Sequence, residues 1–131
     1  MDEKKTILVV DDDIDFAAQV ETALKGAGYA VIVAEGEKQA EALLAGMRPD
    51  LAVVDLMMEQ MDGGFALAYH IKKRYPDVPV LIASAVTAET GLEFDAATEE
   101  ERSWVKADAF LAKPIRPEQL VREIKRLLRE S

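Results

Sequence analysis

The chain contains no cysteine, so neither a disulfide nor a thiolate metal site can hold the fold together. It has a single histidine, His70, which excludes a zinc site built from several His or Cys ligands. No apolar run approaches the roughly 20 residues that a membrane-spanning helix requires. The charged start at Met1–Thr6 is followed by only four apolar residues, too few for the core of a signal peptide. We therefore expect a cytoplasmic protein without membrane insertion.

Positive charge is also scarce in this sequence. There are 16 lysines and arginines against 25 aspartates and glutamates, which gives a formal net charge of −9. Such an acidic balance argues against direct binding of nucleic acid or anionic lipid, although it leaves a basic protein partner open. With 131 residues, half of them hydrophobic, the chain is long enough for one domain with a substantial core.

Short apolar runs alternate with amphipathic stretches along the whole chain. We expect strands at residues 7–10, 29–34, 51–55, 80–84 and 109–112, and helices at about 16–27, 37–47, 62–75 and 118–129. Gly28 is placed to end the first helix. Because the strands are apolar throughout rather than alternating, they predict burial on both faces. The sequence thus predicts a single-domain α/β fold with a doubly wound, five-stranded parallel sheet.

Charged and polar residues collect where the predicted strands end. They are Asp11, Asp12 and Asp13 after the first strand, Asp55 at the third, Ser84 at the fourth and Lys113 after the fifth. In a doubly wound sheet, the carboxyl ends of the strands meet at one rim, and ligands bind there. We therefore expect these side chains to form one site.

Clustered carboxylates repel one another unless a cation neutralises them. Oxygen ligands of this kind suit Mg²⁺, and the sequence offers no His or Cys cluster that would favour zinc. We therefore predict that Mg²⁺ binds among Asp11, Asp12 and Asp55. Asp13 is better placed to cap the first helix, and Asp15 lies in that helix's first turn, where negative charge is favourable.

A metal, a carboxylate, a hydroxyl and a lysine together make up a phosphoryl-transfer site. Asp55 can act as a nucleophile that forms an acyl phosphate. Lys113 and Ser84 would supply positive charge and a hydrogen bond, because this chemistry depends mainly on positioning and electrostatics.

The segments ILVVDDD, LAVVDLMMEQMDGG, VLIASA and AFLAKPI occur in this order, and together the chain resembles the receiver domain of two-component response regulators. The resemblance implies a flavodoxin-like strand order of 2-1-3-4-5. It implies that Asp55 is phosphorylated by a sensor histidine kinase or a phosphotransfer protein, with the backbone carbonyl of Met57 as a further metal ligand. It also implies that Ser84 and Phe110 are switch residues and that Lys113 pairs with the phosphate.

Two features depart from the pattern of that family. Glu59 stands where the family usually has proline, and the stretch between Ser84 and Lys113 is longer than usual. We expect an atypical, enlarged segment between the fourth and fifth strands, in which the family's fourth helix is shifted, lengthened or partly replaced by loop.

The chain ends at Ser131, directly after the last predicted helix. We expect residues 1–131 to form a stand-alone receiver domain without an output domain, which signals to an unknown downstream protein. We do not expect an enzyme beyond self-catalysed phosphorylation and dephosphorylation. Two alternatives remain: a receiver-like adaptor that works without phosphorylation, and a haloacid-dehalogenase-like phosphatase with Asp11 of the Asp11-x-Asp13 pattern as nucleophile.

Overall fold

A computed structural model describes residues 4–55, 63–84, 108–113 and 115–129. Its strands form one parallel sheet in the order β2-β1-β3-β4-β5. They are β1 (Thr6–Val10), β2 (Ala30–Ala34), β3 (Leu51–Asp55), β4 (Val80–Ser84) and β5 (Ala109–Ala112). The described helices are α1 (Ile14–Gly26), α2 (Glu37–Gly46), α3 (Gly63–Arg74) and α6 (Pro117–Leu127). This confirms the predicted doubly wound α/β fold with strand order 2-1-3-4-5.

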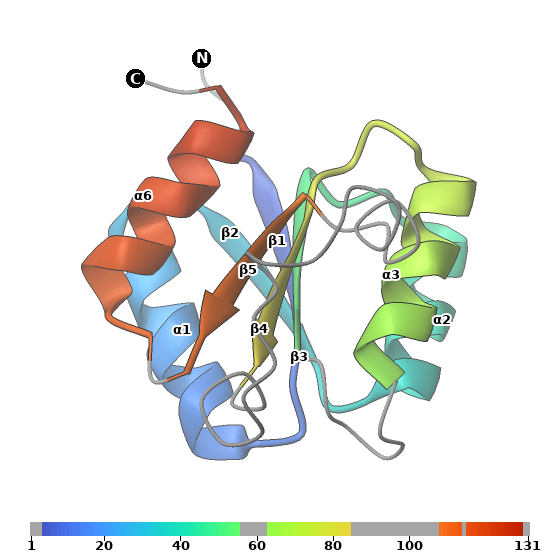
Figure 1. Ribbon diagram of the computed structural model, residues 1–131, viewed down its shortest axis with the longest axis horizontal. Helices are drawn as coiled ribbons and strands as arrows, with labels where there is room; N and C mark the ends of the chain where they lie inside the picture. The colour runs from blue at the N-terminus through green and yellow to red at the C-terminus, as the bar shows by residue number, and fades with distance from the viewer. Residues whose placement is uncertain (1–3, 56–62, 85–107, 114, 130–131) are drawn as a thin grey trace.

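Helices cover both faces of the sheet, as Figure 1 shows, with α1 and α6 on one face and α2 and α3 on the other. Successive side chains of a strand point to opposite faces. Ile7 and Val9 therefore join the core beneath α1 and α6, whereas Leu8 and Val10 join the core beneath α2 and α3. All five residues of the central strand β3 are buried, as expected for a sheet covered on both faces, whereas four of the five residues of the edge strand β2 are only partly buried.

The ends of α1 follow from two residues that the sequence analysis singled out. The Asp13 side chain accepts a hydrogen bond from the Phe16 backbone N–H at 3.2 Å and caps the start of the helix. Gly28 has φ of +98° and lies just beyond the end of the helix. The N–H groups of Gly28 and Tyr29 donate to the carbonyls of Lys25 and Leu24 at 3.1 and 3.0 Å, which completes a Schellman motif. Tyr29, expected in the second strand, belongs to this turn instead.

At the amino ends of two strands, an aspartate side chain accepts a hydrogen bond from the first backbone N–H of the strand. Asp50 accepts from the Thr6 N–H at 2.7 Å, and Asp108 accepts from the Val80 N–H at 2.8 Å. Lys72 of α3 pairs with Asp108 at 2.6 Å. Acidic residues at this edge of the sheet therefore have structural partners.

No helix within the described part of the chain has the length and apolar character needed to cross a bilayer. The predictions for the enlarged segment and the fourth helix fall on residues 85–107, and those for Met57 and Glu59 on residues 56–62, all of which lie outside the described residues.

Candidate functional site

Two buried carboxylates stand at the carboxyl rim of the sheet. Asp55 is the last residue of β3, and Asp11 directly follows β1. Their exposed fractions are only 6% and 2%. The Asp11 backbone N–H donates to the Ala34 carbonyl at 3.0 Å, and its Oδ1 accepts from the Asp13 N–H at 2.8 Å. These bonds fix the Asp11 carboxylate and leave its second oxygen facing the site.

Lys113 reaches this pair along the same rim, from the end of the edge strand β5. It follows β5, which is separated from β3 by β4. Its Nζ donates to Asp11 Oδ2 at 3.0 Å and to Asp55 Oδ1 at 3.3 Å. The lysine side chain is 18% exposed, so both ion pairs are largely shielded from solvent. The sheet thus brings together three of the residues that the sequence analysis assigned to one site.

Burial and charge act in opposite directions on these groups. Burial raises the pKa of Asp55 to about 6, repulsion by Asp11 adds to the rise, and Lys113 opposes it. For Lys113, burial favours a lower pKa, but hydrogen bonding and attraction to Asp11 and Asp55 outweigh it, so its pKa is raised. Lys113 is therefore charged at neutral pH, and Asp55 is mostly ionised.

The donor set fits a hard divalent cation. Carboxylate oxygens of Asp11, Asp12 and Asp55 lie within 4.8 Å of one another, with Asp12 exposed beside its two buried neighbours. All three donors are oxygen, which is the ligand type that Mg²⁺ prefers. A cation here would also relieve the repulsion that raises the pKa of Asp55.

The structure places the remaining predicted site residues as follows. Ser84 ends β4 at the same rim, with its backbone in register with Ala112, but its side chain lies outside what the structure describes. Met57 lies outside it entirely. Phe110 of β5 is partly buried and packs against the core beneath α2 and α3.

One contact of the site was not predicted from the sequence. Lys113 Nζ lies over the aromatic ring of Phe16, 4.3 Å from its centroid. In the sequence, position 16 marks only the expected start of the first helix. The signal available was weak: Phe16 lies in the first turn of α1, shortly after Asp11 and Asp12 in the sequence.

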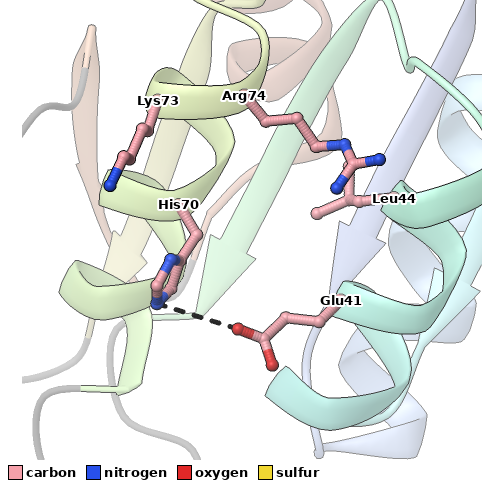
Figure 2. A pocket seen from close by; sticks show the side chains of 5 residues that line it. All are labelled: Glu41, Leu44, His70, Lys73 and Arg74. Atoms are coloured by element: carbon pink, nitrogen blue, oxygen red, sulfur yellow. Dashed lines mark ion pairs between the residues drawn. The ribbon is translucent and has the colours of Figure 1, made fainter.

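A second group of metal-binding residue types lies away from this rim, between α2 and α3. Figure 2 shows Glu41 and His70 facing one another across a pocket that Leu44, Lys73 and Arg74 also line. His70 Nε2 and Glu41 Oε1 are 3.8 Å apart, and Glu37 offers a third ligand atom nearby. Both paired side chains are about half exposed, so we interpret the pair as a surface contact between helices.

Comparison with known proteins agrees with this geometry. A model of the response regulator receiver domain matches residues 7–125. The chain is 33% identical to the phosphate regulon transcriptional regulatory protein PhoB of Pseudomonas aeruginosa, over 97% of this chain and 53% of that protein. It is 32% identical to the response regulator MprA of Mycolicibacterium vanbaalenii, over 95% of this chain and 51% of that one. The chain thus spans about half the length of these relatives.

Solved structures give the same result. The chemotaxis response regulator CheY4 of Vibrio cholerae superposes with a TM-score of 0.79 at 28% identity, covering 95% of this chain and 99% of that one. A CheY-like response regulator receiver domain protein of Methanospirillum hungatei gives a TM-score of 0.80 at 25% identity, covering 97% and 95%. The family model matches nearly the whole chain, and the fold and the residues at the carboxyl rim agree with that match. This chain belongs to the response regulator receiver domain family.

Proposed function

We propose that Asp55 accepts a phosphoryl group from a sensor histidine kinase or a phosphotransfer protein, in a reaction that depends on Mg²⁺. The observation that carries this proposal is the buried Asp55 carboxylate, whose Oδ1 shares the Lys113 ammonium with Asp11. A carboxylate in such a position can act as a nucleophile, and an ammonium beside it can balance the charge that arrives with the phosphoryl group.

The proposed step is a displacement at phosphorus. An Asp55 carboxylate oxygen forms a bond to phosphorus, while the P–N bond of a phosphohistidine donor breaks and the departing imidazole takes up a proton. The product is an acyl phosphate on Asp55. Because the pKa of Asp55 is about 6, its carboxyl group is ionised, and therefore nucleophilic, in most molecules at neutral pH. Asp11, Asp12 and Asp55 would hold Mg²⁺, which would neutralise the charge of the phosphoryl oxygens.

Lys113 has a defined part in this step. Its Nζ already lies 3.3 Å from Asp55 Oδ1, so a small movement brings it to a phosphoryl oxygen attached there. Phosphorylation then shifts a pre-existing equilibrium between two conformations of the chain, in which Ser84 and Phe110 take different positions. This shift changes a surface that binds a downstream protein. The backbone of β4 supports this, because Ser84 ends the strand that lies between Asp55 and Lys113.

On this proposal the chain is a phosphoryl acceptor rather than a turnover enzyme. The phosphatase alternative needs Asp13 as a second catalytic carboxylate, whereas Asp13 Oδ1 caps α1. The downstream partner stays unidentified. PhoB is named a transcriptional regulatory protein, and the chain covers only 53% of it.

Phosphorylation with a small-molecule donor tests the proposal. Incubation with acetyl phosphate and Mg²⁺, followed by intact-mass measurement, should give one labile phosphoryl adduct that is absent in Asp55→Asn and without Mg²⁺. An adduct that persists in Asp55→Asn would refute it. Hydrolysis of a generic phosphate ester, lost in Asp11→Asn but kept in Asp55→Asn, would support the phosphatase instead. Equal partner binding with and without beryllofluoride would support the adaptor.

A further inference from the structure

Within the described part of the chain, the ammonium of Lys113 contacts three groups. Two are the oxygens Asp11 Oδ2 and Asp55 Oδ1, at 3.0 and 3.3 Å. The third is the ring of Phe16, with its centroid 4.3 Å from Nζ. This is well inside the roughly 6 Å over which a cation is attracted to the negative face of an aromatic ring. A lysine ammonium has three N–H groups, so each neighbour can take one of them.

These three neighbours differ in what the proposed reaction does to them. Asp55 is the group that is modified, and Asp11 is one of the carboxylates available to the cation. Both therefore change their charge environment during phosphorylation. The Phe16 ring neither gains nor loses charge, so its contact with Nζ can persist while the lysine moves from the carboxylates to a phosphoryl oxygen.

The ring is itself held in place by two features of α1. Its side chain is partly buried and packs against the core beneath α1 and α6. Its backbone N–H donates to Asp13 Oδ1 at 3.2 Å, in the cap that begins the helix. The fold, rather than Lys113, therefore sets the position of the ring. A residue that positions a flexible lysine side chain must itself be held in this way.

We infer that Phe16 is a positioning residue, which holds the Lys113 ammonium over its ring face so that Nζ meets the phosphoryl group on Asp55. The inference rests on the proposed function and adds to it a residue outside the charged cluster. It excludes a purely space-filling role, because a side chain of similar volume without an aromatic face would not attract the cation.

Substitutions at position 16 separate the two roles. Phe16→Leu keeps an apolar side chain but removes the aromatic face, whereas Phe16→Tyr keeps both. We expect phosphorylation by acetyl phosphate at saturating Mg²⁺ to be about fivefold slower in Phe16→Leu and close to wild type in Phe16→Tyr. Thermal unfolding of each variant shows whether it is folded under the assay conditions.

Fluorinated phenylalanines at position 16 give the sharper test. Mono-, di- and trifluorophenylalanine withdraw electron density from the ring face in steps while barely changing its volume. The inference predicts a stepwise fall in rate that reaches the Phe16→Leu value with the trifluorinated ring, with unfolding temperatures nearly constant. A flat series would overturn the inference.

The outcomes distinguish this inference from the proposed function. If the wild-type chain is phosphorylated and the fluorinated series is flat, only the role of Phe16 fails. If the wild-type chain is not phosphorylated at all, the proposed function fails and the positioning role with it. The upfield ring-current shift of the Lys113 ε-methylene protons, lost in Phe16→Leu, reports the contact itself without any phosphorylation; its absence from the wild-type spectrum would overturn the inference.

Discussion

At the scale of single residues, Asp55 shows how position in the fold changes the chemistry of a side chain. It ends a strand that is buried over all five residues, and it faces a second buried carboxylate, Asp11. Desolvation and repulsion both disfavour its charge, and Lys113 compensates only in part. An ionised carboxylate in such a place is destabilising for the fold and available for chemistry.

The first prediction concerns stability against pH in the absence of metal. The pKa of Asp55 is about 6 in the folded chain against an ordinary 3.8, so the folded state binds this proton more tightly than the unfolded state. Protonation of Asp55 therefore stabilises the folded state. This stabilisation is fully present below about pH 4, is lost as the pH rises through about 6, and amounts to at most about 3 kcal/mol. In EDTA at pH 7.5, Asp55→Asn should therefore unfold at higher denaturant than wild type.

The difference between the two proteins should narrow by roughly half when the pH is lowered from 7.5 to 5, because wild type regains the proton. Urea unfolding followed by circular dichroism measures both values. An equal difference at the two pH values would show that the charge of Asp55 is not what destabilises the wild-type chain.

The second prediction concerns Mg²⁺ and Asp12. A ligand that binds only the folded state stabilises it, by about 2.7 kcal/mol at roughly 100 times its Kd. Mg²⁺ should therefore raise the unfolding temperature of wild type, and Asp12→Asn should remove most of that rise. Asp15→Asn is the matched control, since it removes the charge of another aspartate close in the sequence, in the first turn of α1. Equal loss in both variants would point to general charge screening instead of a site.

At the scale of elements, the way each segment begins and ends was largely predictable. Strand ends at Asp55 and Ser84 were predicted correctly, because apolar runs stop there and polar residues follow. The Asp13 cap and the Gly28 stop were also predicted, since both depend on local chemistry. The prediction that Tyr29 belongs to a strand was wrong. Aromatic residues favour strands, but Tyr29 directly follows Gly28 and takes part in the Schellman motif that ends α1.

The third prediction uses two glycines at the end of α1. Gly28 has φ of +98°, and a Cβ built there meets nothing within 4 Å, so alanine would suffer only from the left-handed backbone. Gly28→Ala should destabilise the chain by about 1 kcal/mol. Gly26→Ala is the control, because Gly26 is the last residue of the helix, without a positive φ, and has equal space around it. That change should be neutral or stabilising by up to about 1 kcal/mol.

Differential scanning calorimetry or urea unfolding of the two glycine variants distinguishes these signs. If Gly28→Ala proved as stable as wild type, the positive φ would not be the reason for glycine at this position.

At the scale of the whole molecule, the parallel sheet determines which distant residues meet. The rim brings Asp11, Asp55 and Lys113 together, and this could be predicted because parallel strands end on the same side. The order of the strands could not be derived from periodicity alone, since apolar runs do not specify their neighbours, and it came from the resemblance to a family. The Phe16–Lys113 contact was missed because it depends on where the first turn of α1 lies relative to the residue that follows β5.

The central claim is that the Asp55 side chain, at the carboxyl rim of the sheet, accepts a phosphoryl group. Acyl phosphates are reduced by borohydride to the alcohol, so a phosphorylated aspartate is converted to homoserine, which mass spectrometry of peptides can locate. After treatment with Mg²⁺ and acetyl phosphate, the account predicts homoserine at position 55 and its absence when Mg²⁺ is withheld. Homoserine at position 11 or 12, or at no position, would contradict it.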